Sequence, residues 1–261
     1  MKVSREDVAL EGAGPRPRAD LEPGRRGALT SPKARRRLGR VGTALIVIGV
    51  VVLAYAAAVL LWRDPVTDLY ARWQQGQLAG ELETMVVEYR KKAPPTAPRS
   101  EPQREAVAAA VARRFQGTLE LGQPLGRIAI PKLGRDDVFL HGTRWRQDLS
   151  RGPGHYPETS LPGLGKTVAI AGHRTTFGAP FRRIDELERG DPIRLELPYG
   201  TFAYRVVGRE IVDSDDWSII RERGFETLVL SACYPLYSSS QRIVVYGRLV
   251  RVRPPATARA A

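Results

Sequence analysis

Cys233 is the only cysteine in this chain of 261 residues, and it lies where a strand is expected to end. It follows the apolar run 228–230, and Arg242 directly precedes a second apolar run, residues 243–245. If the two runs pair as an antiparallel hairpin, the end of the first strand lies beside the start of the second. Cys233 and Arg242 then flank the same mouth of a sheet.

His173 follows a third apolar run, residues 168–171, so it also lies where a strand is expected to end. No local pattern places it beside the other two residues. A thiolate is a nucleophile, and a nearby histidine can protonate a leaving amine. An arginine offers a rigid set of donors to a developing oxyanion. Together, Cys233, His173 and Arg242 predict nucleophilic acyl transfer.

Each of these residues also has an ordinary structural explanation. Free cysteines are often buried and inert, and an unpaired cysteine outside the cytoplasm can form an intermolecular bridge. A loop histidine is commonly solvated, and an arginine that opens a strand can be an edge charge. The other two histidines, His141 and His155, are given no catalytic role; we expect His155, in GPGHYP, to help shape the fold.

The second half of the chain, residues 118–253, reads as an all-β domain. Short β-rich runs alternate with turn residues, which indicates seven or eight strands, and a PYGT turn separates two of them. This spacing favours a closed or nearly closed antiparallel barrel over a βαβ sheet. About 135 residues are sufficient for one independent core.

Residues 41–62 form an uncharged apolar segment, VGTALIVIGVVVLAYAAAVLLW. As a helix it would be about 33 Å long, enough to cross the hydrocarbon core of a bilayer. A cleaved signal peptide is the alternative, but the apolar run is longer than a signal sequence requires and its basic leader is long. The run of basic residues that precedes it predicts a cytoplasmic N-terminus and an extracellular second half.

The remaining segments connect or flank these two parts. Residues 1–40 hold 11 Lys/Arg against 5 Asp/Glu and are expected to be a disordered basic tail, as are the last residues, 254–261. Residues 63–117 are expected to form a helical stalk (66–92), a proline-rich spacer and a short helix (103–116). The stalk either holds the barrel clear of the membrane or packs against the barrel.

The charge of the chain does not indicate nucleic-acid binding. The formal net charge is +13, but nearly half of this excess lies in the basic tail. The rest is spread thinly over the other residues, whereas a nucleic-acid interface concentrates basic residues on one folded face.

Three separated motifs, in this order, resemble the sortases, the membrane-anchored cysteine transpeptidases of Gram-positive bacteria. They are IAGHRTTFGAPFRRIDELERGD around His173, TLVLSACYP in place of the family's TLxTC motif, and QRIVVYGRL around Arg242. GPGHYPETSLPGLGKT and WRDPVTDLYARWQQ are also family-like, so the resemblance covers about residues 41–253. The pattern is similar to the actinobacterial class E, and the CYP tripeptide is similar to class D. Ser231 and Ala232 depart from the usual Thr-Thr or Val-Thr before the cysteine.

The resemblance implies an eight-stranded sortase-like β-barrel with short helices, and Cys233, His173 and Arg242 as catalytic residues. Cys233 would attack the Thr–Gly bond of an LPxTG- or LAxTG-type C-terminal sorting signal. An amine of a cell-wall precursor or a pilin would then accept the acyl group. No metal or organic cofactor is implied.

Two other classes of protein remain as alternatives. L,D-transpeptidases also use cysteine, histidine and arginine near the cell wall, but they place His-Gly directly before the cysteine, where this chain has Ser231 and Ala232. A non-catalytic, membrane-tethered β-barrel would keep Cys233 as a buried core thiol.

Overall fold

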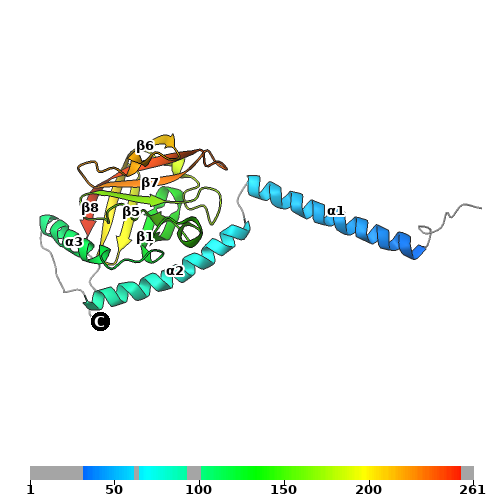
Figure 1. Ribbon diagram of the computed structural model, residues 1–261, viewed down its shortest axis with the longest axis horizontal. Coiled ribbons are helices and arrows are strands. Elements are labelled where there is room, and N and C mark those ends of the chain that lie inside the picture. The colour runs from blue at the N-terminus through cyan, green and yellow to red at the C-terminus, as the bar shows by residue number, and fades with distance from the viewer. Residues whose placement is uncertain (1–31, 62–64, 93–100, 254–261) are drawn as a thin grey trace, which may run out of the picture. The chain divides into compact units, whose positions relative to one another are not determined.

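The computed structural model describes residues 32–61, 65–92 and 101–253, and it divides the chain into two compact units, 1–56 and 57–261 (Figure 1). The expectations for residues 1–31, for the spacer at 93–100 and for the tail at 254–261 lie outside the described residues.

Helix α1, Pro32–Leu61, contains the apolar segment. The window Arg35–Ala58 is long and apolar enough to cross a membrane, and none of it is buried. The helix begins earlier than expected: residues 32–40, which we predicted to be disordered, are helical. Proline suits the first turn of a helix, and Lys, Arg, Ala and Leu are good helix formers, so the apolar helix extends into the basic segment.

Eight strands close into one barrel, as the sequence predicts. Around the barrel the order is β1-β2-β3-β4-β7-β8-β6-β5. The strands are β1 Pro124–Ile130, β2 Arg135–His141, β3 Gly154–His155, β4 Thr167–Ala171, β5 Pro192–Leu197, β6 Gly200–Asp213, β7 Thr227–Tyr234 and β8 Gln241–Arg253. Short helical turns lie between them at Pro131–Leu133, Trp145–Leu149, Ile184–Glu186 and Trp217–Ile220.

The strand directions differ from the antiparallel barrel that we predicted. Strand β4 pairs with β7 in parallel, and so does β2 with β3. Parallel neighbours need a long connection between them. The whole of β5 and β6 connects β4 to β7, and residues 142–153 connect β2 to β3. The parallel pair matters for function, because the carboxyl ends of β4 and β7 lie at the same rim of the barrel.

Side chains alternate across the barrel wall along β7. Leu228, Leu230 and Ala232 belong to the main core inside the barrel. Val229 points the other way, into a smaller apolar cluster on the outer surface. Because successive side chains in a strand point to opposite faces, Cys233 lies on the same outer face as Val229.

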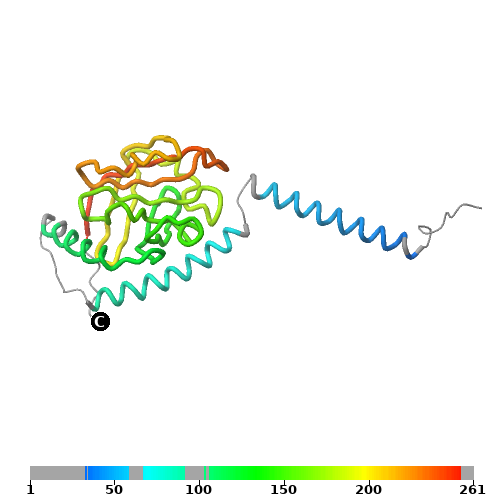
Figure 2. The backbone as a smooth tube through the Cα atoms, in the orientation of Figure 1, coloured from blue at the N-terminus to red at the C-terminus, as the bar shows by residue number. Residues whose placement is uncertain are grey.

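The two helices of the connecting region pack against the barrel. Helix α2, Pro65–Lys92, runs along one side of the barrel (Figure 2), where Leu78 and Leu82 cluster with Val138 and Leu140 of β2. Helix α3, Glu101–Gln116, places alanines and Phe115 in the main core. Of the two alternatives for the stalk, the structure therefore shows packing, and residues 57–261 form one compact unit.

His141 and His155 hold the short strand β3 in place. Nε2 of His155 lies 3.0 Å from the carbonyl oxygen of Ser160, to which it donates. Its Nδ1 therefore accepts from Nδ1 of His141, 3.3 Å away. Burial lowers the pKa of His155 to about 4, so the imidazole is neutral at neutral pH. This agrees with the structural role that we expected for His155.

Candidate active site

Cys233 and Arg242 lie directly opposite each other on neighbouring antiparallel strands, β7 and β8. Both are half-buried, and Cys233 is a free thiol. A guanidinium nitrogen of Arg242 donates to the carbonyl oxygens of Ser239 and Gln241, each at 3.0 Å, which fixes it against the connection between the strands. The expected hairpin geometry is thus confirmed, and it leaves other N–H groups of Arg242 available.

His173 lies at the same rim as Cys233 because of the parallel pair β4–β7. Ala171 is the register partner of Ser231, and the amide of Gly172 donates to the carbonyl oxygen of Ser231 at 3.0 Å. His173 lies two residues beyond Ala171, and Cys233 lies two residues beyond Ser231. The parallel pairing therefore brings His173 to the rim that carries Cys233, a placement that no local sequence pattern could predict.

The imidazole of His173 is half-buried, and one of its nitrogens has no partner. Its ring packs against the ring of Phe177, with 5.3 Å between centroids. Nε2 is buried without a hydrogen bond within the described residues. Burial lowers the pKa of His173, so the neutral imidazole predominates at neutral pH. Buried polar atoms normally have partners, so this unpaired nitrogen marks His173 as a candidate functional residue.

Arg174, the next residue, is a buried cation beside the site. Only 3% of its surface is exposed. Its guanidinium donates to the carbonyl oxygen of Arg182, pairs with Asp185 at 2.7 Å, and lies 5.8 Å from the ring centre of Tyr234. Arg174 therefore ties the loop that carries His173 to the strand that carries Cys233. The sequence analysis missed it, although a charge three residues after a buried apolar run is a detectable signal.

Tyr156 is a second neighbour that the sequence analysis did not single out. Its hydroxyl lies 2.9 Å from the hydroxyl of Ser231. Burial raises the pKa of Tyr156, while the charge of Arg242 lowers it and that of Cys233 raises it, so the phenol lies near both residues. It belongs to GPGHYP, the segment that was noted only as family-like.

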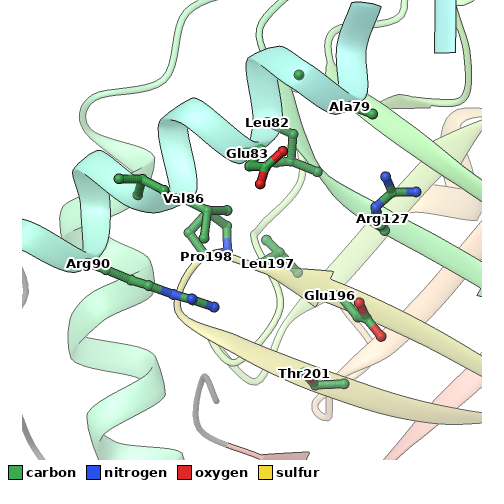
Figure 3. A pocket seen from close by; sticks show the side chains of 12 residues that line it. Ala79, Leu82, Glu83, Val86, Arg90, Arg127, Glu196, Leu197, Pro198 and Thr201 are labelled. Carbon is green, nitrogen blue, oxygen red and sulfur yellow. The ribbon is translucent and has the colours of Figure 1, made fainter. Parts of the chain in front are cut away.

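The candidate residues lie at the rim of the barrel, away from the cavity under α2. The cavity shown in Figure 3, of about 650 Å³, lies between α2, β1 and the turn from β5 to β6 and contains none of the three candidate residues. Among the described residues, no group of three or more His, Cys, Asp or Glu side chains is arranged to hold a metal ion.

Comparisons with known proteins agree with this geometry. The sortase domain family model matches residues 128–250. The chain is 40% identical over 135 residues to Sortase D of Bacillus subtilis (strain 168), covering 50% of this chain and 66% of that protein. It is 32% identical over 157 residues to Sortase SrtE1 of Streptomyces coelicolor, covering 54% of this chain and 45% of that protein. The match thus spans between about half and two thirds of these relatives.

A solved structure supports the same fold. The SrtF sortase from Corynebacterium diphtheriae superposes with a TM-score of 0.50 at 26% identity, covering 55% of this chain and 93% of that chain. The relatives named Sortase D and SrtE1 agree with the class D and class E features of the sequence. The closed barrel, the domain match and these relatives lead to one conclusion: the chain belongs to the sortase family, whose members are cysteine transpeptidases.

Proposed function

We propose that this chain is a membrane-anchored transpeptidase that uses Cys233 as its nucleophile, His173 as its acid and base, and Arg242 to stabilise the oxyanion. One observation carries the proposal. Cys233 and Arg242 are register partners on the outer face of the barrel, at the rim where the strand before His173 also ends.

In the first step, His173 takes the proton of the Cys233 thiol, and the resulting thiolate attacks the Thr–Gly carbonyl carbon of a C-terminal sorting signal, so that a C–S bond forms. The tetrahedral intermediate then expels the glycine amine as the C–N bond breaks. His173 gives a proton to that amine through Nε2, which is unpaired within the described part of the chain. The product of this step is a thioester between Cys233 and the threonine carbonyl.

Arg242 stabilises the negative oxygen of the tetrahedral intermediate. The carbonyl oxygens of Ser239 and Gln241 hold one of its guanidinium nitrogens, and the rest of the rigid fork can donate to the oxyanion. A donor that is already positioned needs little reorganisation during the reaction.

In the second step, an amine attacks the thioester, a new C–N bond forms and the C–S bond breaks. His173 takes the proton that the amine loses and returns it to the sulfur of Cys233, which restores the thiol. We assign this amine to a cell-wall precursor or a pilin lysine. The substrates would be proteins with an LPxTG- or LAxTG-type signal.

The anchor in this proposal is residues 41–62, within α1. The basic residues at the start of α1 would remain in the cytoplasm and residues 118–253 would lie outside the cell. A single apolar helix on the N-terminal side of the extracellular catalytic barrel would keep the enzyme at the membrane.

A cleavage assay with a panel of sorting-motif peptides tests the proposed reaction. The full chain in detergent should cut LPxTG- or LAxTG-type peptides between threonine and glycine, and an added amine should appear in the product. Matched peptides with glycine replaced by proline, which lacks the amide hydrogen and constrains the scissile bond, should remain intact. Mass spectrometry identifies the fragments, and cleavage at another bond would contradict the assignment.

The pH dependence of cleavage should report the environment of His173. Burial lowers the pKa of His173. When His173 is protonated while Cys233 is still a thiol, the imidazole cannot accept the thiol proton and the enzyme is inactive. The acid limb of kcat/KM should therefore lie below the ordinary histidine range. Phe177→Ala removes the covering ring and admits water, so the pKa should rise and the limb should move to higher pH.

The matched control is Phe225→Ala, which removes an exposed ring that packs under Arg248. This variant should leave the acid limb in place. If Phe177→Ala also leaves it in place, the acid limb does not belong to His173.

A further inference from the structure

Six arginines lie along one outer surface of the barrel, away from Cys233. We call this surface the arginine track. It extends from the end of α2 across β1, β5, β6 and β8, and its members are Arg90, Arg127, Arg194, Arg205, Arg251 and Arg253.

Strand register places the track residues on one face. Arg194 of β5 lies opposite Ala203 of β6, which lies opposite Arg251 of β8. Adjacent strands are about 5 Å apart, so the two arginines stand roughly 10 Å from each other across a small residue. Thr201 lies opposite Arg253 in the neighbouring row. Because the small side chains of Ala203 and Thr201 lie beside long arginine side chains, this part of the barrel surface is recessed, and we call it the floor of the track.

Two hollows occupy this floor and meet at Thr201. The first, of about 650 Å³, is bordered by Arg90 and Arg127, and in Figure 3 Arg90 extends from α2 toward the turn between β5 and β6. The second, of about 510 Å³, is bordered by Arg194, Arg205, Arg251 and Arg253, and no carboxylate lines it. Because they share a lining residue, the hollows form one elongated, concave path.

The charge of the track is compensated at some positions only. Arg194 is paired with Glu196 at 2.7 Å, Arg127 lies 3.9 Å from Asp136, and Arg205 donates to the carbonyl oxygen of Gly190 at 2.8 Å. The guanidinium groups of Arg251 and Arg253 make no hydrogen bond or ion pair with any residue in the described ranges 32–61, 65–92 and 101–253. The uncompensated charge therefore lies at the end of β8.

We propose that the arginine track binds a linear polyanion whose charges are phosphate groups. The planar guanidinium fork matches phosphate oxygens with two parallel hydrogen bonds. A single phosphate would reach only one or two arginines, whereas an extended chain can follow the path through both hollows. The path is recessed, which suits a flexible chain better than the flat surface of a bilayer. Binding here leaves the rim with Cys233 free.

The test measures binding of fluorescent inorganic polyphosphate to the full chain in phosphatidylcholine nanodiscs, across a range of salt concentrations. Arg251→Gln/Arg253→Gln should raise Kd by about tenfold or more and reduce the slope of log K against log salt by about 1 to 2. The matched control, Arg72→Gln/Arg146→Gln, removes the same charge from exposed positions outside the track and should bind like the wild type. Peptide cleavage by both variants should be unchanged.

Three results would overturn the proposal. Equal weakening in both double variants would mean that only net charge matters. Orthophosphate and unlabelled polyphosphate can each compete with the fluorescent polyphosphate. If they compete equally well at the same total concentration of phosphate groups, the surface is a site for a single anion. If Arg251→Gln/Arg253→Gln loses binding to phosphatidylglycerol vesicles but still binds polyphosphate like the wild type, the surface binds lipid instead. Because the readout is binding, a failure here leaves the proposed transpeptidase function untouched.

Discussion

The Cys233→Ala variant is expected to keep a folded barrel and to lose sorting-peptide cleavage. Cys233 lies half-buried on the outer face, outside the main core, so removing its sulfur leaves the packing of the barrel nearly unchanged. Removing a covalent nucleophile typically costs at least about 10⁴-fold in rate. The measurements are kcat for peptide cleavage and the thermal melting temperature.

His173→Ala should cause a loss of similar size, since the proposed mechanism assigns the protonation of the leaving amine to His173. Its control is His141→Ala, which removes a histidine from the pair that supports β3. That variant should lower the melting temperature of the protein and leave kcat for peptide cleavage nearly unchanged. Equal losses of activity in the two histidine variants would show that the acid has been assigned to the wrong residue.

The Arg242→Lys variant should lose about 10²–10³-fold in kcat, although it keeps the positive charge. All three donors of lysine lie on one nitrogen, so an ammonium held by the carbonyl oxygens of Ser239 and Gln241 has no second nitrogen in a planar fork to reach the oxyanion. Losing one oxyanion donor typically has an effect of this size. Peptide cleavage under saturating substrate measures it.

Arg251→Lys is the matched control on the same strand, because Arg251 is exposed and distant in register from Cys233. Arg248→Lys is a less clean control, since Arg248 packs over Phe225. We expect little change in cleavage for Arg251→Lys. Equal, mild losses at Arg242 and Arg251 would mean that Arg242 is a solvated strand charge.

Local patterns were sufficient to predict the barrel and one half of the candidate site. Short β-rich runs and turn residues indicated the strands, and the short connection between β7 and β8 predicted that Cys233 faces Arg242. Hairpin register depends on neighbouring residues only, so it can be inferred from sequence. The helical character of the region around residues 66–92 was visible for the same reason.

The remaining features depend on contacts between distant segments. His173 reaches the rim through the parallel pair β4–β7, whose strands are separated by the whole of β5 and β6. The partners of Arg174 and Tyr156 also come from distant strands or loops. Likewise, the packing of α2 on β2 joins residues that no local periodicity relates. Sequence order alone does not determine such pairings.

The most direct test is the mass of the intact protein after brief incubation with a sorting-motif peptide and an acid quench. The proposed reaction predicts a mass increase equal to the peptide fragment ending in threonine. Hydroxylamine should remove this adduct, because it cleaves thioesters, and proteolysis should map the adduct to Cys233. The Cys233→Ala variant should show none. Peptide cleavage without an adduct in the wild type, or an adduct that persists in Cys233→Ala, would contradict the central claim that Cys233 forms the acyl-enzyme.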